Sequence, residues 1–181
     1  MTRSILAAAL AGIALVSSSY VAEAQISTLA KPVQFGIAAG AALPTSDLSN
    51  SFDTGFNVTG TLGLNPALIP LGIRVDVAYN SFAAKGGGAN IHFTSVTGNL
   101  VYKFPSPGVS PYAIGGAGLY NAAVNINGLG NGGSDNHFGW NLGGGISMPL
   151  SGFDTFIEAR YNRMATGQPT EFIPIRVGMR F

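Results

Sequence analysis

The feature of this sequence that most constrains its fold is an alternation of apolar and polar residues with a period of two. Residues 71–82 show it clearly. Apolar side chains occupy every second position from Leu71 to Tyr79, and polar, charged or small residues stand between them. Successive residues of a β-strand point to opposite faces of the sheet. The alternation therefore predicts a strand with one apolar face and one polar face.

Eight such segments follow one another, and no convincing helical periodicity occurs from Lys31 onward. Clusters of Gly, Pro, Asn, Asp and Ser separate them, and short connections alternate with longer ones, as in an antiparallel up-and-down meander. Eight antiparallel strands can close into a barrel that leaves no open edge. The expected strands cover residues 33–43, 52–64, 71–82, 91–104, 111–121, 137–149, 153–163 and 172–181.

Charged residues make up only 9% of the chain, against about 25% in a typical soluble protein. None of those in the mature chain falls on the apolar face of an expected strand. A lipid-facing Arg or Lys at mid-depth costs about 2–4 kcal/mol, so a membrane barrel requires this placement. We expect the charges on the polar faces to pair inside the barrel as a structural network. They are Arg74, Asp76, Lys103, Glu158, Arg160, Arg176 and Arg180.

The alternation alone does not decide which face points inward, because a soluble barrel for a lipophilic ligand has the same period. Aromatic residues near the strand ends favour an outward apolar face, since membrane barrels carry an aromatic girdle at each interface. The girdle expected at one rim consists of Tyr79, Phe82, Tyr120, Phe138, Trp140 and Tyr161. The girdle expected at the other rim consists of Tyr102, Phe104, Tyr112 and Phe181.

The N-terminal segment has the three parts of a secretory signal peptide: a positive start, an apolar run and a small-x-small pattern. Ala22 and Ala24 form that last pattern, so cleavage is expected before Gln25. The chain is therefore expected to consist of a signal peptide, residues 1–24, and a barrel domain, residues 25–181.

The last ten residues, FIPIRVGMRF, have apolar side chains at alternate positions and end in phenylalanine. This pattern resembles the C-terminal signal of bacterial outer-membrane proteins that the barrel-assembly machinery reads. With the phrases YAIGGAGLY, FGWNLGGGISM and FIEARYNRM, residues 31–181 resemble the small eight-stranded outer-membrane barrels of the OmpA transmembrane-domain and OmpX type. The residues that carry the C-terminal pattern are Ile173, Ile175, Val177, Met179 and Phe181.

The resemblance implies an all-β, eight-stranded antiparallel up-and-down transmembrane β-barrel in the bacterial outer membrane. Outer-membrane lipid and, during insertion, the barrel-assembly machinery are the expected partners, and a monomer is the expected state. Both termini are expected on the periplasmic side. The longer connections are then expected to face outward, at residues 44–51, 83–90, 121–136 and 164–171.

Motifs for chemistry are not visible in the sequence. Cysteine is absent, and no metal-ligand spacing, phosphate loop or nucleotide fingerprint occurs. A net charge of +1 gives no electrostatic case for nucleic-acid binding. The lipid A deacylase barrels use a His-x-Ser pair, whereas His92 is followed by Phe93 and Thr94, and His137 has no hydroxyl at that spacing. No catalytic, cofactor-binding or metal-binding residue is therefore assigned.

The sequence thus predicts a non-enzymatic outer-membrane barrel with a structural role in the envelope or a role in surface interaction. Exposed loops carry such roles, and residues 121–136 are the foremost candidate for contact with a surface partner. Two alternatives stay open, a narrow pore for small solutes and an enzyme that modifies lipid A.

Overall fold

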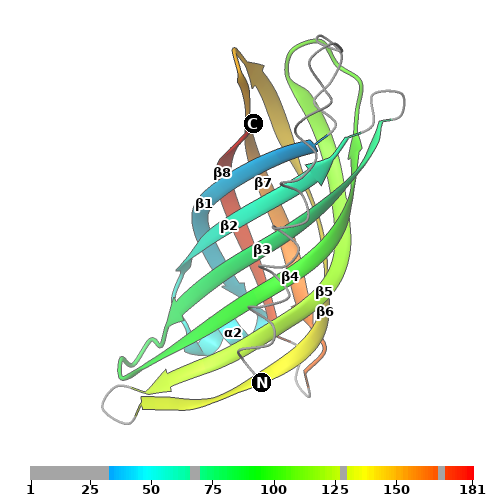
Figure 1. The fold of residues 1–181 in the computed structure, drawn as a ribbon. Helices are drawn as coiled ribbons and strands as arrows, with labels where there is room; N and C mark the ends of the chain where they lie inside the picture. Colours follow the sequence, from blue (N-terminus) through cyan, green and yellow to red (C-terminus); the bar gives the residue numbers. More distant parts are fainter. Residues whose placement is uncertain (1–32, 66–69, 127–129, 167–169) are drawn as a thin grey trace. The chain divides into compact units, whose positions relative to one another are not determined.

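Alternating residues and glycine-containing turns build an antiparallel meander that closes on itself (Figure 1). The computed structural model describes residues 33–65, 70–126, 130–166 and 170–181, so the expected signal peptide lies outside the described residues. Each strand pairs with its neighbours in the chain, and β1 pairs with β8 to complete the barrel. The strands are β1 (Val33–Thr45), β2 (Gly55–Leu64), β3 (Leu71–Ala83), β4 (Ala89–Lys103), β5 (Ser110–Ile126), β6 (Gly130–Leu150), β7 (Phe153–Met164) and β8 (Thr170–Arg180).

The closing seam joins the first and last strands along almost their whole length. Ten residue pairs link β1 to β8, from Gly36 with Arg180 to Thr45 with Glu171. Phe35 and Phe181 extend this seam, since each backbone N–H donates to the carbonyl of the other residue, at 3.2 and 2.7 Å. The predicted eight-stranded up-and-down barrel is confirmed.

The barrel has two dissimilar ends. At the end that carries Phe181, here called the terminal end, β2 and β3, β4 and β5, and β6 and β7 are connected. The last of these connections has only two residues, and its Gly152 adopts a φ of 96°, a conformation that glycine accommodates without strain. The opposite end, here called the loop end, carries α2 (Ser46–Ser51) between β1 and β2 (Figure 1).

The structure predicted for two of the connections is wrong. Residues 44–51 were expected as a loop, but six of them form the helix α2, and its Leu48 is buried against the barrel interior. Residues 121–136 are predicted as one of the longer loops, but the strands β5 and β6 continue through most of this segment as a hairpin. Backbone pairing across the hairpin overrides the low strand propensity of its Gly and Asn residues.

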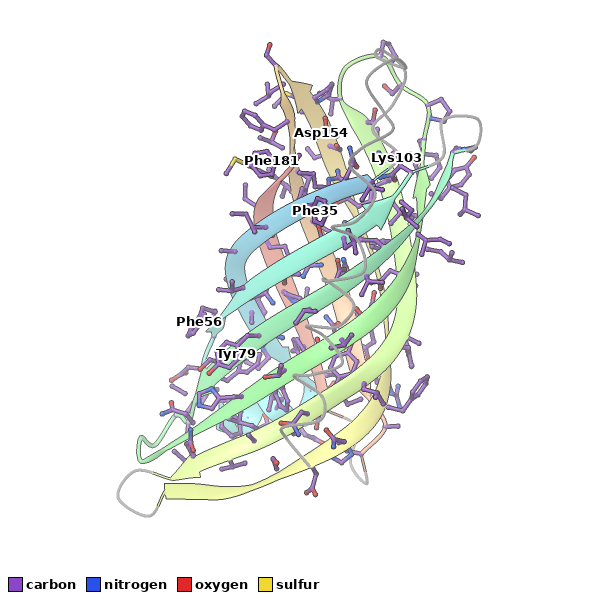
Figure 2. All side chains as sticks on the ribbon, viewed as in Figure 1. Phe35, Phe56, Tyr79, Lys103, Asp154 and Phe181 are labelled. Carbon is purple, nitrogen blue, oxygen red and sulfur yellow. The ribbon has the colours of Figure 1, made fainter. Side chains whose placement is uncertain are left out.

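The apolar face of the strands points outward, as expected for a membrane barrel. Polar and aromatic side chains are buried in the interior, and many large apolar side chains are exposed on the outer face. No helix among the described residues is long and apolar enough to cross a membrane. Phe56 and Tyr79 lie toward one end of the barrel, and Phe35 and Phe181 lie toward the other (Figure 2). The outward-facing apolar residues include Ile37, Val58, Ile73, Leu100, Leu119, Leu142 and Val177.

Three members of the expected girdles are not on the outer face. Phe82, Tyr112 and Tyr120 are buried inside the barrel, with at most 3% of their surface exposed. The physical reason is strand parity, because Phe82 lies three residues after the outward-facing Tyr79, an odd separation that places it on the opposite face. These rings fill the interior instead of lying at the membrane interface.

Candidate functional site: the filled lumen

The interior of the barrel is a dense polar layer built on one row of the sheet. Register places Tyr112 opposite Gly145, Gly145 opposite Glu158, and Glu158 opposite Arg176, on the consecutive strands β5 to β8. Gly145 has no side chain, so the Tyr112 ring lies over it. A Cβ added to Gly145 would stand 2.6 Å from the Tyr112 hydroxyl oxygen. The tyrosine thereby reaches across one strand and donates to Glu158 Oε2 at 2.7 Å.

Glu158 is the centre of an ion-pair network. Three guanidinium groups surround its carboxylate: Arg74 Nη2 lies 2.6 Å from Oε2, and Arg160 Nε and Arg176 Nη2 lie 2.6 and 2.5 Å from Oε1. All four side chains are almost fully shielded from solvent. Ion pairs in such a setting are kept only where each charge finds partners that replace its hydration.

Asp76 is the second carboxylate of this network. Its carboxylate lies 3.1 Å from Arg74 Nε and 3.8 Å from Arg176 Nη2, and it forms a very short ion pair with Arg160 Nη2. The network therefore joins five of the seven charges that the sequence places on the polar face: Arg74, Asp76, Glu158, Arg160 and Arg176.

The other two charges on that face stand apart. Arg180 donates to Ser147 Oγ at 2.9 Å, and its guanidinium lies 4.8 Å from the centre of the Phe156 ring. Lys103 lies toward the terminal end, as does Asp154 (Figure 2). Neither Arg180 nor Lys103 belongs to an ion pair with any of the described residues.

Neutral amides and hydroxyls extend the network on its loop-end side. Asn99 donates to Asp76 Oδ2 at 3.1 Å and accepts from Asn141 at 2.9 Å. Arg176 Nη1 donates to Thr59 at 2.7 Å. Each amide can both donate and accept, so it satisfies the groups that the charges leave over.

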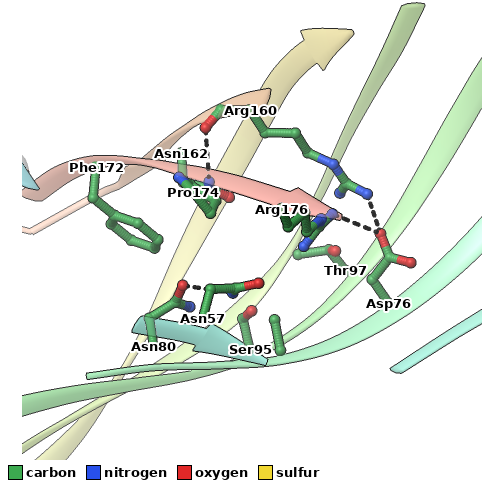
Figure 3. Close-up of a pocket in the computed structure, with 11 residues that line it drawn as sticks. Asn57, Asp76, Asn80, Ser95, Thr97, Arg160, Asn162, Phe172, Pro174 and Arg176 are labelled. Atoms are coloured by element: carbon green, nitrogen blue, oxygen red, sulfur yellow. Dashed lines mark hydrogen bonds and ion pairs between the residues drawn. The ribbon is translucent and has the colours of Figure 1, made fainter. Parts of the chain in front are cut away.

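A small cavity lies beside these groups and is drawn in Figure 3. Its walls include Asn57, Asn80, Asp76 and Arg176, and Asn57 Nδ2 donates to Asn80 Oδ1 at 2.7 Å. The cavity measures about 10 Å³, about the room that one water molecule needs. It is too small for a solute, so the lumen is filled at this level.

An apolar cluster closes the lumen toward the loop end. The rings of Phe82, Phe93 and Phe172 contact one another, with centres 5.5–5.8 Å apart. Leu48 from α2 is buried in the same cluster, so the helix helps to cover this end. A second cluster of buried side chains lies on the terminal-end side of the ion pairs. Its members are Ala38, Val101, Tyr112, Ile114 and Phe156.

In the part of the chain that the structure describes, neither histidine contacts a serine or a carboxylate through a hydrogen bond. His92 Nδ1 lies 2.8 Å from the Tyr79 hydroxyl, and the two rings stack 5.5 Å apart on the outer surface. Among the described residues, no hydrogen bond joins His92 or His137 to a serine or a carboxylate, and no group of three His, Asp or Glu side chains could hold a metal ion.

The hairpin of β5 and β6 continues past its neighbour β7 at the loop end. The pairing of β6 with β7 starts at Gly139 with Met164, whereas β6 itself starts at Gly130. Among the described residues, 130–137 therefore have β5 as their strand partner and none on the β7 side. Residues 133–136 of this segment are exposed.

Sequence reasoning missed several residues of this interior. It placed Tyr112 on the outer face, and it did not assign Asn99 or Phe172 to the site. Strict strand parity was the available signal, because Tyr112 precedes the outward-facing Ala113 by one residue and Asn99 precedes Leu100 by one residue.

The chain is similar to known outer-membrane proteins over most of its length. The family model described as outer membrane protein beta-barrel domain matches residues 6–181. No match was found among curated proteins. Neisserial surface protein A has a similar structure, with 20% identity, a TM-score of 0.69, and coverage of 83% of this chain and 96% of that chain.

Two further solved structures are similar at lower scores. A major outer membrane protein from Thermus thermophilus is 16% identical, with a TM-score of 0.52 and coverage of 83% of this chain and 99% of that one. The attachment invasion locus protein Ail of Yersinia pestis is 19% identical, with a TM-score of 0.51 and coverage of 82% and 97%. At such identities the similarity shows the fold.

Proposed function

This chain belongs to the outer membrane protein beta-barrel domain family, and from that premise we propose that it is a closed, non-enzymatic barrel that acts through surface interaction at its loop end. Family membership confirms the resemblance carried by the C-terminal pattern and the glycine-rich strand phrases. The barrel holds the chain in the outer membrane. The part that contacts a surface partner is the hairpin formed by residues 121–126 of β5 and 130–137 of β6.

One observation carries this proposal: the lumen is filled while the hairpin is extended. Ion pairs around Glu158 occupy the middle of the barrel, and aromatic rings close the loop end. A filled interior leaves no room for a solute path through these layers. The hairpin, in contrast, presents exposed polar side chains, including Asp135, on strands whose position is fixed by backbone pairing.

The edge of β6 that has no β7 partner among the described residues is poorly suited to pair with a strand of another molecule. It contains Gly133 with a φ of 106°, and a register irregularity lies opposite, between Ala123 and Asn125. Irregular backbone and a charged side chain are devices that keep sheet edges from aggregating. We therefore propose that the side chains of the hairpin contact the surface partner, in particular Asn121, Asp135 and Asn136.

The test compares cells that display the intact barrel with cells that display a shortened hairpin. Deleting residues 124–134 removes the tip, and deleting 85–88 shortens the neighbouring β3–β4 connection as a matched control. Adhesion of the cells to protein-coated surfaces is measured, with electrophoretic mobility before and after boiling as the check on folding. Loss of adhesion only on the 124–134 deletion is expected. Equal adhesion of all three folded proteins would contradict the proposal.

The expected partners during assembly are part of the same proposal. Ile175, Val177, Met179 and Phe181 face outward on the final strand, so the alternating pattern is presented on the lipid-facing side. We propose that the barrel-assembly machinery recognises this pattern during insertion. Replacing Phe181 with Ser is expected to lower the amount of folded barrel in the outer membrane without changing the amount synthesised.

A further inference from the structure

The interior carries more positive than negative charge. Arg74, Arg160, Arg176 and Arg180 are at most 3% exposed, and the carboxylates buried with them are Asp76 and Glu158. Two positive charges are therefore in excess within the buried layer. Charge that is removed from water without a partner is costly, so a compensating anion in this layer lowers the free energy of the folded barrel.

Two of these arginines lie near one aromatic ring toward the terminal end. There the guanidinium groups of Arg74 and Arg180 lie 6.0 and 4.8 Å from the centre of one ring, Phe156. Asp154 stands opposite Arg180 in the strand register, yet its carboxylate accepts a hydrogen bond from Gln34 at 3.3 Å and makes no ion pair with the described residues. Lys103 adds a further positive charge toward the same end.

Buried donors on these arginines also lack partners. Arg74 Nη1 and Arg180 Nε are buried and have no hydrogen-bond partner among the described atoms, and neither has the hydroxyl of Thr61. Buried polar groups in folded proteins are almost always paired, so each of these groups is expected to have a partner, either water or an ion. Asp76 Oδ1 also lacks a hydrogen bond. It lies 3.1 Å from Arg74 Nε, a different nitrogen of the guanidinium from the unpaired Nη1.

The sheet register explains why Thr61 and Arg180 meet. Arg180 pairs with Gly36, and Gly36 pairs with Thr61, on the strands β8, β1 and β2. A Cβ added to Gly36 would stand 2.7 Å from Thr61 Oγ1 and 2.8 Å from Arg180 Cγ. Because Gly36 has no side chain, the Thr61 hydroxyl and the aliphatic part of the Arg180 side chain can both lie over its backbone.

We propose that the lumen binds one small inorganic anion of the size of chloride between Arg74 and Arg180, with the Thr61 hydroxyl as a third donor. The anion compensates one of the two excess charges and satisfies donors that no side chain reaches. None of these three residues lines the small cavity of Figure 3, and the site is independent of the surface interaction proposed above.

Urea unfolding of the full barrel in lipid vesicles tests the site, with chloride as the probe. Sodium chloride is exchanged for sodium gluconate at constant ionic strength, so that general screening is unchanged. For one bound anion, the unfolding equilibrium constant falls about tenfold per tenfold rise in chloride once the site is mostly filled. The same constant in both salts would overturn the proposal.

Two variants locate the effect. Arg180→Met removes one of the proposed ligands and is expected to abolish the chloride dependence. Arg163→Met removes an exposed arginine that pairs with Glu171 at the loop end, and it is expected to keep the dependence unchanged. Chloride dependence that survives in Arg180→Met would overturn the assignment.

A second measurement does not depend on the folding of any variant. Crystals of the wild-type barrel grown in bromide are expected to show an anomalous scattering peak between Arg74 and Arg180. The absence of a peak there at saturating bromide would overturn the proposal, as would a peak found elsewhere in the lumen only.

Discussion

The Tyr112 hydroxyl donates a 2.7 Å hydrogen bond to Glu158 Oε2 across Gly145, the residue that separates the two in the sheet. The bond places a neutral donor beside a carboxylate that already contacts three guanidinium groups. Three consecutive strands must be in register for it to form. The Tyr112–Glu158 contact therefore reports on correct closure of the lumen.

Replacing Tyr112 with Phe removes the hydroxyl and leaves the ring. Because the acceptor is charged and buried, we expect the free energy of unfolding to fall by about 1.5–3 kcal/mol. Urea unfolding in lipid vesicles measures the change. Tyr102→Phe is the matched control, since Tyr102 is exposed on the outer face. Equal effects of the two substitutions on the free energy of unfolding would contradict a stabilising role of the buried hydrogen bond.

Replacing Gly145 with Ala tests the close approach at the centre of the row. The added Cβ would stand 2.4 Å from the Ile157 carbonyl oxygen and 2.6 Å from the Tyr112 hydroxyl, so strand and ring must move apart. We expect a loss of about 1–3 kcal/mol from overpacking. Gly98→Ala is the control, because nothing lies within 4 Å of its Cβ position. A tolerated Gly145→Ala would contradict the described packing.

Replacing Glu158 with Gln leaves three guanidinium groups around a neutral side chain. Breaking a buried ion pair in this way costs about 3–5 kcal/mol, because the three buried guanidinium groups then share a single carboxylate, that of Asp76. The measurement is again urea unfolding, with the yield of heat-modifiable barrel as a second readout. Glu171→Gln, which alters the ion pair of the half-exposed Arg163, is expected to have little effect.

Conductance distinguishes a filled lumen from a narrow pore. In planar bilayers the wild-type barrel is expected to be silent. The Phe172→Ala variant is also expected to be silent, because the ion pairs of Glu158 and Asp76 close the barrel behind the aromatic cluster. Stepwise currents from the wild type would show that the interior opens, and the pore alternative would then replace the closed barrel.

Strand periodicity was sufficient to predict the barrel, because each strand has one face in contact with lipid and one in the lumen. The period of two places Arg74, Asp76 and Glu158 inside without any knowledge of which strands touch. Which charges meet across the lumen depends on register and closure, and these follow from pairing over the whole sheet. Arg74 and Glu158 are 84 residues apart in the chain, so no local pattern predicts their contact.

The errors in the sequence-based prediction have physical causes. Phe82, Tyr112 and Tyr120 were assigned to the girdles because they are aromatic and lie near strand ends, although their parity places them inside. The helix α2 has only six residues and one buried side chain, Leu48, so it carries no detectable helical period. The β5–β6 hairpin is rich in Gly and Asn, which locally favour turns.

The most direct test of the central claim, an outer-membrane barrel with its apolar face outward and its lumen filled, uses the single tryptophan of the chain. Trp140 lies on the outer face of β6, and 42% of its surface is exposed. In vesicles with bromine-labelled acyl chains, its fluorescence is expected to be strongly quenched in the folded barrel and to recover on unfolding in urea. Fluorescence of the folded protein that bromine-labelled lipid does not quench, together with quenching by a water-soluble agent, would contradict the account.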